Sequence, residues 1–279
     1  MGTSMNRIGL IAGSGDFPLE FAKAAKQKGL AVVAVAHEGE TLPELAQWTD
    51  AIIWIKLGHL GKLIKFFKEQ GVSNVLMAGG IKKTGMFGGL PDLRGAALLA
   101  KMVAKHDDSL LRAVADELES EGITVRESTL YLDNLLAPAG ILTKRKPTKD
   151  EWKDIAFGWQ MAKEIGRLDI GQTVVVKDKT VLAVEAIEGT DETIRRGGRL
   201  CREGAVVVKS CKPQQDLRFD LPATGLQTIV TMQEVKAGCL AIEAGKTIMI
   251  QKDSLISRAD QAGIAIVALD KNGSLPSPA

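Results

Sequence analysis

The sequence predicts an α/β protein of two domains, and three observations support this prediction. The chain has 279 residues, which suits two domains of about 100–200 residues each. Hydrophobic residues make up 45% and charged residues 25%, the ordinary balance of a globular protein. Short apolar runs alternate with helix-period segments along the chain, a pattern typical of parallel strands connected by helices.

The first half starts with an apolar run at residues 7–12, which predicts a buried strand. A glycine turn, Gly13-Ser14-Gly15, leads into a helical segment and a second strand, so the four pieces form a βαβ unit. The predicted helices here are 19–28, 60–70 and 93–121 with a break at 105–108, and the later strands are 30–36, 51–55 and 74–80. We therefore expect an N-terminal domain at 6–138 with a Rossmann-like, mostly parallel sheet.

The second half follows a stretch at 137–148 that is rich in turn-forming residues and predicts a linker. Helices are predicted at 150–165, 226–237 and 253–261, and strands at 173–177, 180–186, 205–209, 247–250 and 264–268. Asp178-Lys179 forms a short hairpin turn between the first two strands. These elements predict a C-terminal α/β domain at 148–275 with a mixed sheet.

Composition excludes several functional classes. The net charge of +2 is far from the strongly basic character of a general nucleic-acid binder. No apolar stretch approaches the roughly 18 residues of a membrane-spanning helix, and the first residues lack a signal-peptide pattern. Three cysteines without CxxC spacing suggest reduced, buried thiols. We expect a cytoplasmic protein.

Histidine is too scarce for a zinc hydrolase. The chain has three, His37, His59 and His106, and they are isolated from one another in the sequence. Zinc hydrolases and many two-metal phosphoesterases take several ligands from imidazoles. Any hydrolysis must therefore rely on carboxylates, lysines, arginines and a hard cation such as Mg²⁺.

Two glycine clusters follow predicted buried strands. Gly13-Ser14-Gly15 lies where a helix N-terminus can offer N–H groups to an anion. Pro18 occupies the place of the third glycine of a dinucleotide fingerprint, which argues against NAD but leaves phosphate or nucleotide binding open. Gly79, Gly80 and Lys82 lie at a strand end of the kind that binds ligands in α/β sheets. Plain structural turns are the alternative at both places.

The segment from 208 to 225 is the most unusual in composition. Its charged residues are Lys209, Lys212, Asp216, Arg218 and Asp220. Cations beside acids are what phosphoryl transfer requires, because the cations hold phosphate oxygens while a carboxylate binds Mg²⁺ or orients water. A solvated polar loop is the alternative interpretation.

A further acidic stretch, residues 185–191, precedes a predicted basic helix. Gly189-Thr190-Asp191 has the composition of a helix N-cap. Its functional options are phosphate contact by Thr190 and cation binding by Glu185 or Asp191.

Four motifs in order, at 13–15, 107–112, 185–191 and 212–222, resemble the LpxI family, the UDP-2,3-diacylglucosamine pyrophosphatases of lipid A biosynthesis. The resemblance covers about residues 7–269. It implies two domains with a chamber between them for the diacyl sugar. It also implies Mg²⁺-dependent hydrolysis to UMP and 2,3-diacylglucosamine 1-phosphate, and an essential aspartate at Asp220 in Asp220-Leu221-Pro222.

The resemblance and the local chemistry together suggest a role for each candidate residue. The catalytic candidates are Asp220, Lys209 and Arg218, and the metal candidates are Asp220 and Asp191. The substrate-binding candidates are Gly13, Ser14, Gly15, Gly79, Gly80, Lys82, Thr190, Lys212, Gln215 and Thr224. The expected partner is the UDP-linked diacylated glucosamine, with transient contact at the inner-membrane surface, a homodimer, and no nucleic acid.

Two other functions stay open at this point. A NAD- or nucleotide-sugar-dependent oxidoreductase or epimerase would fit the opening βαβ unit, but Tyr131 lacks a lysine four residues later, where Leu135 stands. A non-catalytic nucleotide-binding module is the other alternative, although it would not need the charged segment at 208–225.

Overall fold

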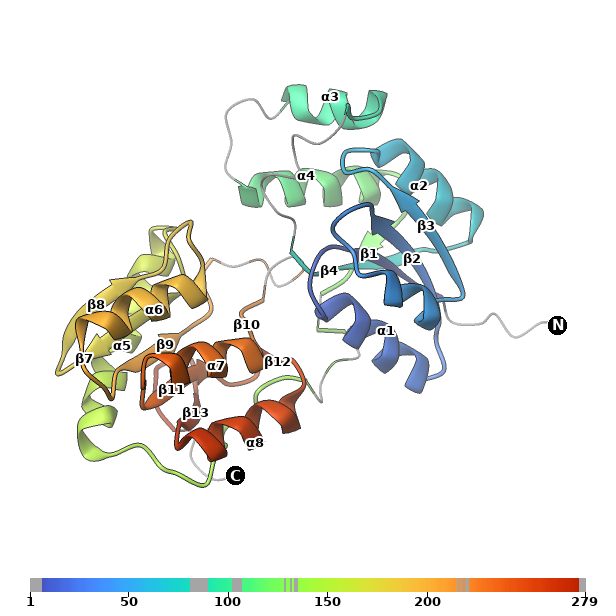
Figure 1. Ribbon diagram of the computed structural model, residues 1–279. Coiled ribbons are helices and arrows are strands. Elements are labelled where there is room, and N and C mark those ends of the chain that lie inside the picture. The colour runs from blue at the N-terminus through green and yellow to red at the C-terminus, as the bar shows by residue number, and fades with distance from the viewer. Residues whose placement is uncertain are drawn as a thin grey trace. The chain divides into compact units, whose positions relative to one another are not determined.

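A computed structural model describes residues 7–80, 90–101, 107–127, 129–130, 132, 135–214, 216, 218 and 221–275. The chain forms two compact units, Met1–Asp133 with Leu217–Phe219 and Asn134–Asp216 with Asp220–Ala279. Both units are α/β, so the predicted fold class is confirmed (Figure 1). The predicted domain bounds, 6–138 and 148–275, stay a prediction.

The first unit contains a parallel sheet of five strands in the order β3-β2-β1-β4-β5. The strands are β1 (Arg7–Ala12), β2 (Ala31–His37), β3 (Ala51–Ile55), β4 (Asn74–Ala78) and β5 (Thr124–Val125). This is the Rossmann order, in which the connections reverse direction between β1 and β4. Ligands bind at that reversal, beyond the carboxyl ends of the strands.

Helices cover both faces of this sheet. They are α1 (Phe17–Gln27), η1 (Pro43–Trp48), α2 (Leu60–Glu69), α3 (Leu93–Lys101) and α4 (Asp107–Ser120). α1 packs against β1, β2 and β4. On the other face, Phe67 of α2 and Leu118 of α4 are fully buried in one core with Val33 and Val35 of β2. The side chains of β2 therefore pack alternately against α1 on one face of the sheet and against α2 and α4 on the other.

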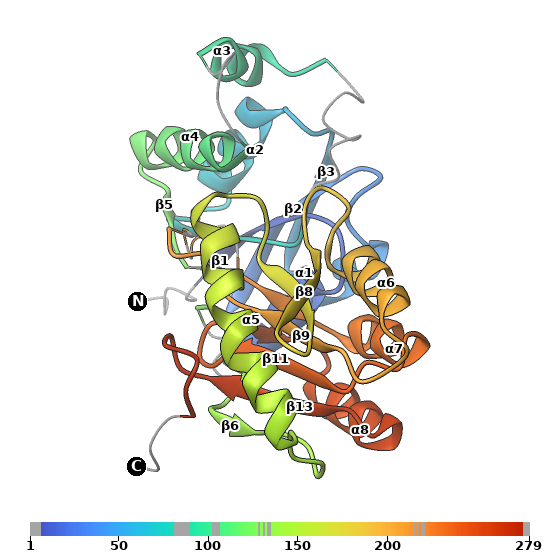
Figure 2. The same ribbon diagram turned by 90° about the vertical axis from the view of Figure 1, so that its left-hand side faces the viewer.

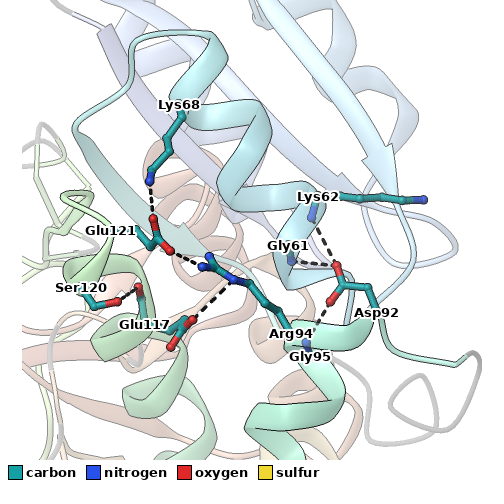
Figure 3. A network of polar contacts seen from close by, with 9 residues as sticks. All are labelled: Gly61, Lys62, Lys68, Asp92, Arg94, Gly95, Glu117, Ser120 and Glu121. Carbon is teal, nitrogen blue, oxygen red and sulfur yellow. Dashed lines mark hydrogen bonds and ion pairs between the residues drawn. The ribbon is translucent and has the colours of Figure 1, made fainter.

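A polar network ties α2, α3 and α4 together (Figure 3). Oδ2 of Asp92 accepts the N–H of Gly61 at 2.7 Å, and Oδ1 accepts the N–H of Gly95 at 2.8 Å. One carboxylate therefore binds the N-termini of two helices, where free N–H groups favour an anion. Arg94 of α3 pairs with Glu121, which follows α4.

The second unit contains a mixed sheet of six strands in the order β6-β13-β11-β9-β7-β8. The strands are β6 (Gly140–Ile141), β7 (Thr173–Lys177), β8 (Thr180–Val184), β9 (Val206–Lys209), β11 (Cys239–Glu243) and β13 (Ala265–Leu269). β9, β11 and β13 are parallel, whereas β6, β7 and β8 pair antiparallel to their neighbours. This sheet is mixed, as the sequence predicts.

Helices pack on both faces of this sheet (Figure 2). The helices are α5 (Lys149–Arg167), α6 (Thr190–Leu200), α7 (Leu226–Glu234) and α8 (Lys252–Ala262). Trp159 of α5 packs in a core with Val176 and Val208, while Ile194 of α6 packs with Val175 and Val207 on the opposite face. Within the described ranges, no helix combines the length and apolar character needed to cross a membrane.

The structure differs from the predicted elements mainly around β11. The predicted helix at 226–237 ends at Glu234, and the central strand β11, which the sequence analysis did not identify, follows Gly238. The predicted strand at 247–250 is the short β12 (Ile248–Met249), which pairs with β10 (Ala223–Thr224) in a separate two-stranded sheet. Residues 140–141, in the stretch predicted as a linker, form the edge strand β6. Such short pairings leave little periodic signal because only two residues take part.

Candidate active site

The two glycine clusters of the first unit meet at the carboxyl ends of β1 and β4. The N–H of Gly13 donates to the carbonyl of Ala78 at 2.8 Å, and the N–H of Ser14 donates to the carbonyl of Gly80 at 2.6 Å. Oγ of Ser14 donates to the same carbonyl at 2.8 Å. The two segments lie 66 residues apart in sequence, yet they form one structure at the reversal point of the sheet.

This close approach explains two of the glycines. A Cβ atom on Gly13 would lie 2.3 Å from the carbonyl oxygen of Gly80, and one on Gly79 would lie 2.5 Å from that of Ser14. Both distances are shorter than van der Waals contact, so neither position accepts a side chain without moving backbone. Gly79 also has a φ of +88°, which favours glycine.

The hydrogen bonds correct one part of the sequence-based mechanism. The N–H groups of Gly13 and Ser14 are used within the protein, so they are not the free donors that we expected to bind an anion. Gly15 has a φ of +85° and open space around its α-carbon. The substrate-binding assignment of this turn stays a prediction, and it now depends on Gly15 and the adjoining start of α1.

His37 and Thr41 hold the end of β1. The carbonyl of Ala12 accepts hydrogen bonds from Oγ1 of Thr41 at 2.7 Å and from Nδ1 of His37 at 2.9 Å. The backbone N–H of His37 donates in turn to Oγ1 of Thr41 at 2.9 Å. Burial lowers the pKa of His37, against the opposing effects of the Ala12 hydrogen bond and of Glu40. Neutral His37 thus anchors the residue before the glycine turn.

The second unit brings together Lys209, Thr190 and Glu185. Nζ of Lys209, at the carboxyl end of β9, donates to Oγ1 of Thr190 at 3.0 Å and to the carbonyl of Ala223 at 2.8 Å. Oγ1 of Thr190 donates to Oε1 of Glu185 at 2.8 Å. Lys209 and Glu185 are buried, with 5% and 8% of their surfaces exposed. Two predicted site residues therefore lie in direct contact, and Glu185, which we considered only as a cation ligand, joins them.

Asp191 and Thr224 belong to the same neighbourhood. Burial raises the pKa of Asp191, opposed by the charges of Lys209 and Arg195, while Glu185 raises it further. Thr224 is the residue after Ala223, and its Oγ1 is buried without a hydrogen-bond partner in the described part of the chain. The chain here is held by β12, because the carbonyls of Pro222 and Thr224 accept the N–H groups of Ile248 and Ile250.

The remaining predicted residues lie elsewhere or outside the described residues. Nζ of Lys212 pairs with Asp169, just after α5, at 2.6 Å. Arg218 groups with the first unit, where Nη1 contacts Oε1 of Glu119 at 3.3 Å. The predicted residues outside the described ranges are Lys82, Gln215 and Asp220.

Glu243 is a buried acid that the sequence analysis missed. It ends β11 with 1% of its surface exposed, and Oε2 accepts Nζ of Lys163 at 2.6 Å and the N–H of Cys211 at 3.0 Å. It thereby fixes the chain just beyond β9. An acidic residue at the end of an apolar run can indicate a polar group at the end of a buried strand. Glu243 was not recognised in this way because β11 itself was not predicted.

The Lys209 cluster offers carboxylate oxygens, which are ligands for hard cations rather than for soft transition metals. Oε2 of Glu185 is buried and has no hydrogen-bond partner among the described atoms. Glu185 and Asp191 both act electrostatically on this cluster, and their carboxylate oxygens are of the kind that suits Mg²⁺. In the described ranges, no three His, Cys, Asp or Glu side chains form a metal-binding group.

Comparisons with known proteins match both units. Residues 7–135 match the LpxI N-terminal domain, and residues 138–267 match the LpxI C-terminal domain. The UDP-2,3-diacylglucosamine pyrophosphatase LpxI of Caulobacter vibrioides is 35% identical over 279 residues, covering 95% of this chain and 98% of that protein. The bifunctional purine biosynthesis protein PurH of Anaeromyxobacter sp. is 31% identical over 129 residues, covering 46% of this chain and 22% of PurH.

Similarity to solved structures is weak. The biotin carboxylase domain of Hydrogenobacter thermophilus 2-oxoglutarate carboxylase aligns with a TM-score of 0.29 and 14% identity, covering 64% of this chain and 36% of that one. Similarity at this level carries no argument about function.

Proposed function

The chain belongs to the LpxI family, and from this premise we infer that it is a UDP-2,3-diacylglucosamine pyrophosphatase of lipid A biosynthesis. It cleaves the pyrophosphate bond of this substrate to give UMP and 2,3-diacylglucosamine 1-phosphate. The match to a pyrophosphatase spans nearly all of both chains. It therefore favours hydrolysis over the oxidoreductase, epimerase and non-catalytic alternatives.

The observation that carries the catalytic proposal is the contact of Lys209 with Thr190 and with the chain at Ala223. Ala223 directly follows Asp220-Leu221-Pro222, the motif in which the family resemblance places the essential aspartate. A buried ammonium stabilises negative charge more strongly than an exposed one, because water screens it less. We assign to Lys209 the stabilisation of charge that develops on the pyrophosphate oxygens.

Mg²⁺ dependence is a further part of the proposal. The residues that would hold the ion are Asp220, Asp191 and Glu185, whose Oε2 is buried and without a partner among the described residues. When bound, Mg²⁺ supplies neutralisation of pyrophosphate charge and polarisation of the phosphorus centre. The chain's part is to hold the carboxylates, and Thr190 does so for Glu185 through the 2.8 Å hydrogen bond to Oε1.

Product analysis tests the function directly. The protein is incubated with UDP-2,3-diacylglucosamine and Mg²⁺, and the nucleotide products are separated by chromatography. We expect UMP and the acylated sugar 1-phosphate. Release of UDP instead would indicate cleavage at the sugar, as in a glycosyl transferase, and would overturn the proposal.

Metal binding has its own test, which does not depend on turnover. Mn²⁺ binding is measured by electron paramagnetic resonance for the wild type, for Glu185→Gln and for Glu188→Gln. Glu188 is the matched control, because it lies on the same loop but its Oε1 already accepts Nη2 of Arg196 at 2.6 Å. We expect weaker binding for Glu185→Gln alone. Equal binding by all three proteins would remove Glu185 from the ligand set.

We also propose a cytoplasmic location with transient contact at the inner-membrane surface, and a homodimer. The membrane proposal is supported by the substrate's two acyl chains, since each CH₂ exposed to water costs about 0.8 kcal/mol. Flotation with phospholipid vesicles should show weak, reversible association with the membrane, and recovery of the protein only with detergent would contradict the membrane proposal.

Light scattering after gel filtration tests the homodimer, which a monomeric mass at micromolar concentration would exclude.

A further inference from the structure

A hollow of about 420 Å³ lies at the carboxyl ends of β2 and β3 in the first unit. Its lining includes Glu38, Trp54, Lys56, His59 and Lys62. None of these residues belongs to the candidate site derived from the sequence. The hollow lies on the edge of the sheet at which α/β proteins bind ligands, and its size is within the range of small-molecule pockets, about 300–1,000 Å³.

Two lysines give the hollow a positive side. Lys56 and Lys62 are exposed, and within the described ranges neither ammonium is paired with a carboxylate. The N–H of Lys62 is held by Oδ2 of Asp92 at 3.3 Å. Figure 3 shows its side chain extending away from Asp92, Glu117 and Glu121. The helix position is therefore fixed while the ammonium stays available to an anion.

The opposite side offers acceptors. Glu38 directly follows β2, and its N–H donates to the carbonyl of Ile55 at 3.0 Å, which ties the ends of β2 and β3 together. In dinucleotide-binding sheets an acid about 20 residues beyond the glycine turn accepts the ribose hydroxyls. Nε2 of His59 contacts the carbonyl of Leu90 at 3.3 Å and so carries the proton. Nδ1 of His59 is buried and has no hydrogen-bond partner in the described chain.

We propose that this hollow binds the nucleoside end of the substrate, a uridine phosphate, with the base against Trp54, the ribose hydroxyls on Glu38 and the α-phosphate on Lys56 and Lys62. A nucleoside phosphate is the ligand class that needs an aromatic face, a carboxylate and two cations together. The choice of uridine rests on the proposed function.

The strand order supports this placement. The hollow lies between β2 and β3, and the glycine turn lies between β1 and β4, two strand spacings away along one edge. Neighbouring strands are about 4.8 Å apart, so the separation is about 10 Å. An extended nucleoside diphosphate is long enough to span this distance and to reach the open space beside Gly15.

Calorimetric titration of UMP tests the proposal with a matched pair of lysines on α2. Lys62→Ala and Glu38→Gln should each raise the Kd for UMP about tenfold or more, the loss expected for one charge-assisted contact. Lys65→Ala is the control, because Lys65 lies one turn further along and its side chain is 77% exposed and paired with Glu69. It should leave the Kd unchanged. In hydrolysis, the two test variants should raise KM with little change in kcat.

Two results would overturn the assignment of the hollow, and a third would separate it from the proposed function. An unchanged Kd for UMP in both Lys62→Ala and Glu38→Gln would place the nucleotide elsewhere and overturn the inference. Inorganic phosphate competing as well as UMP would also overturn it, since the hollow would then be an anion site without nucleoside recognition. If the wild type fails to hydrolyse the substrate but Lys62→Ala still weakens UMP binding, the proposed function fails and the assignment of the hollow stands.

Discussion

Replacing Lys209 by methionine should damage both stability and activity. The change removes an ammonium that donates to Oγ1 of Thr190 and to the carbonyl of Ala223, while methionine still fills the buried volume of the lysine stem. Lys209 is only 5% exposed, so water cannot replace the lost donor. The carbonyl of Ala223 and the hydroxyl of Thr190 lose a partner inside the protein.

The expected loss of stability follows from those two contacts. A hydrogen bond to a charged group contributes about 1.5–3 kcal/mol, so two contribute about 3–6 kcal/mol. Removing the ammonium also removes the cost of burying it, which brings the net loss toward the lower end, about 3 kcal/mol. Loss of a preorganised charge at the reacting group should lower kcat by about 10²–10³.

The assay combines urea unfolding with turnover. Trp152 and Trp159 lie on α5, so in a background in which Trp48 and Trp54 are replaced by phenylalanine, fluorescence reports the second unit alone. The midpoint and slope give the free energy of unfolding. Turnover is measured with the UDP-linked substrate in the original background.

Lys212→Met is the matched control. Nζ of Lys212 pairs with Asp169 at 2.6 Å, and their side chains are 16% and 37% exposed. Pairs of this partly exposed kind contribute about 1 kcal/mol or less, so the control should unfold close to the wild type. If Lys209→Met matched the wild type in both unfolding and kcat, or if the two variants unfolded alike, the role given to the Lys209 cluster would be refuted.

Three further predictions concern other parts of the chain. Asp220→Ala should lower kcat by several orders of magnitude while substrate still binds, with Asp216→Ala as the control; an inactive Asp216 variant beside a working Asp220 variant would reverse the assignment. Gly15→Val should raise KM more than it lowers kcat, because the turn has a φ of +85° and adjoins the expected nucleotide path; unchanged kinetics would make the turn purely structural. His37→Gln should remove a pH dependence of stability. Burial lowers the pKa of His37 below its ordinary 6.5, so as the pH falls the unfolded chain takes up a proton on His37 before the folded protein does. Neutral His37 therefore contributes its full stability above about pH 6.5, and this stability is lost as the pH falls toward the lower pKa of the folded state. Urea unfolding of both proteins from about pH 7.5 to about pH 5.5 checks this, and parallel curves would contradict it.

The elements that follow from local pattern were predictable from the sequence. β1, β3 and β7 occupy the predicted residues, 7–12, 51–55 and 173–177. Each is a run of apolar residues whose burial needs no knowledge of a partner strand. The two glycine clusters were also recognised, because a glycine-rich stretch directly after a buried strand is itself a local signal. The family resemblance rests on short motifs in order, which the sequence carries on its own.

Only the tertiary structure decided which of these signals meet. Gly13 and Gly79 are glycines because two loops approach within contact distance, a constraint that exists only after β1 and β4 pair. Lys209 and Lys212 are three residues apart, yet one is buried against Thr190 and the other pairs with Asp169. The two lysines differ in environment because the fold brings different neighbours to each ammonium. Burial and hydrogen-bond partners are long-range properties, so the sequence could supply the charged groups but not their pairing.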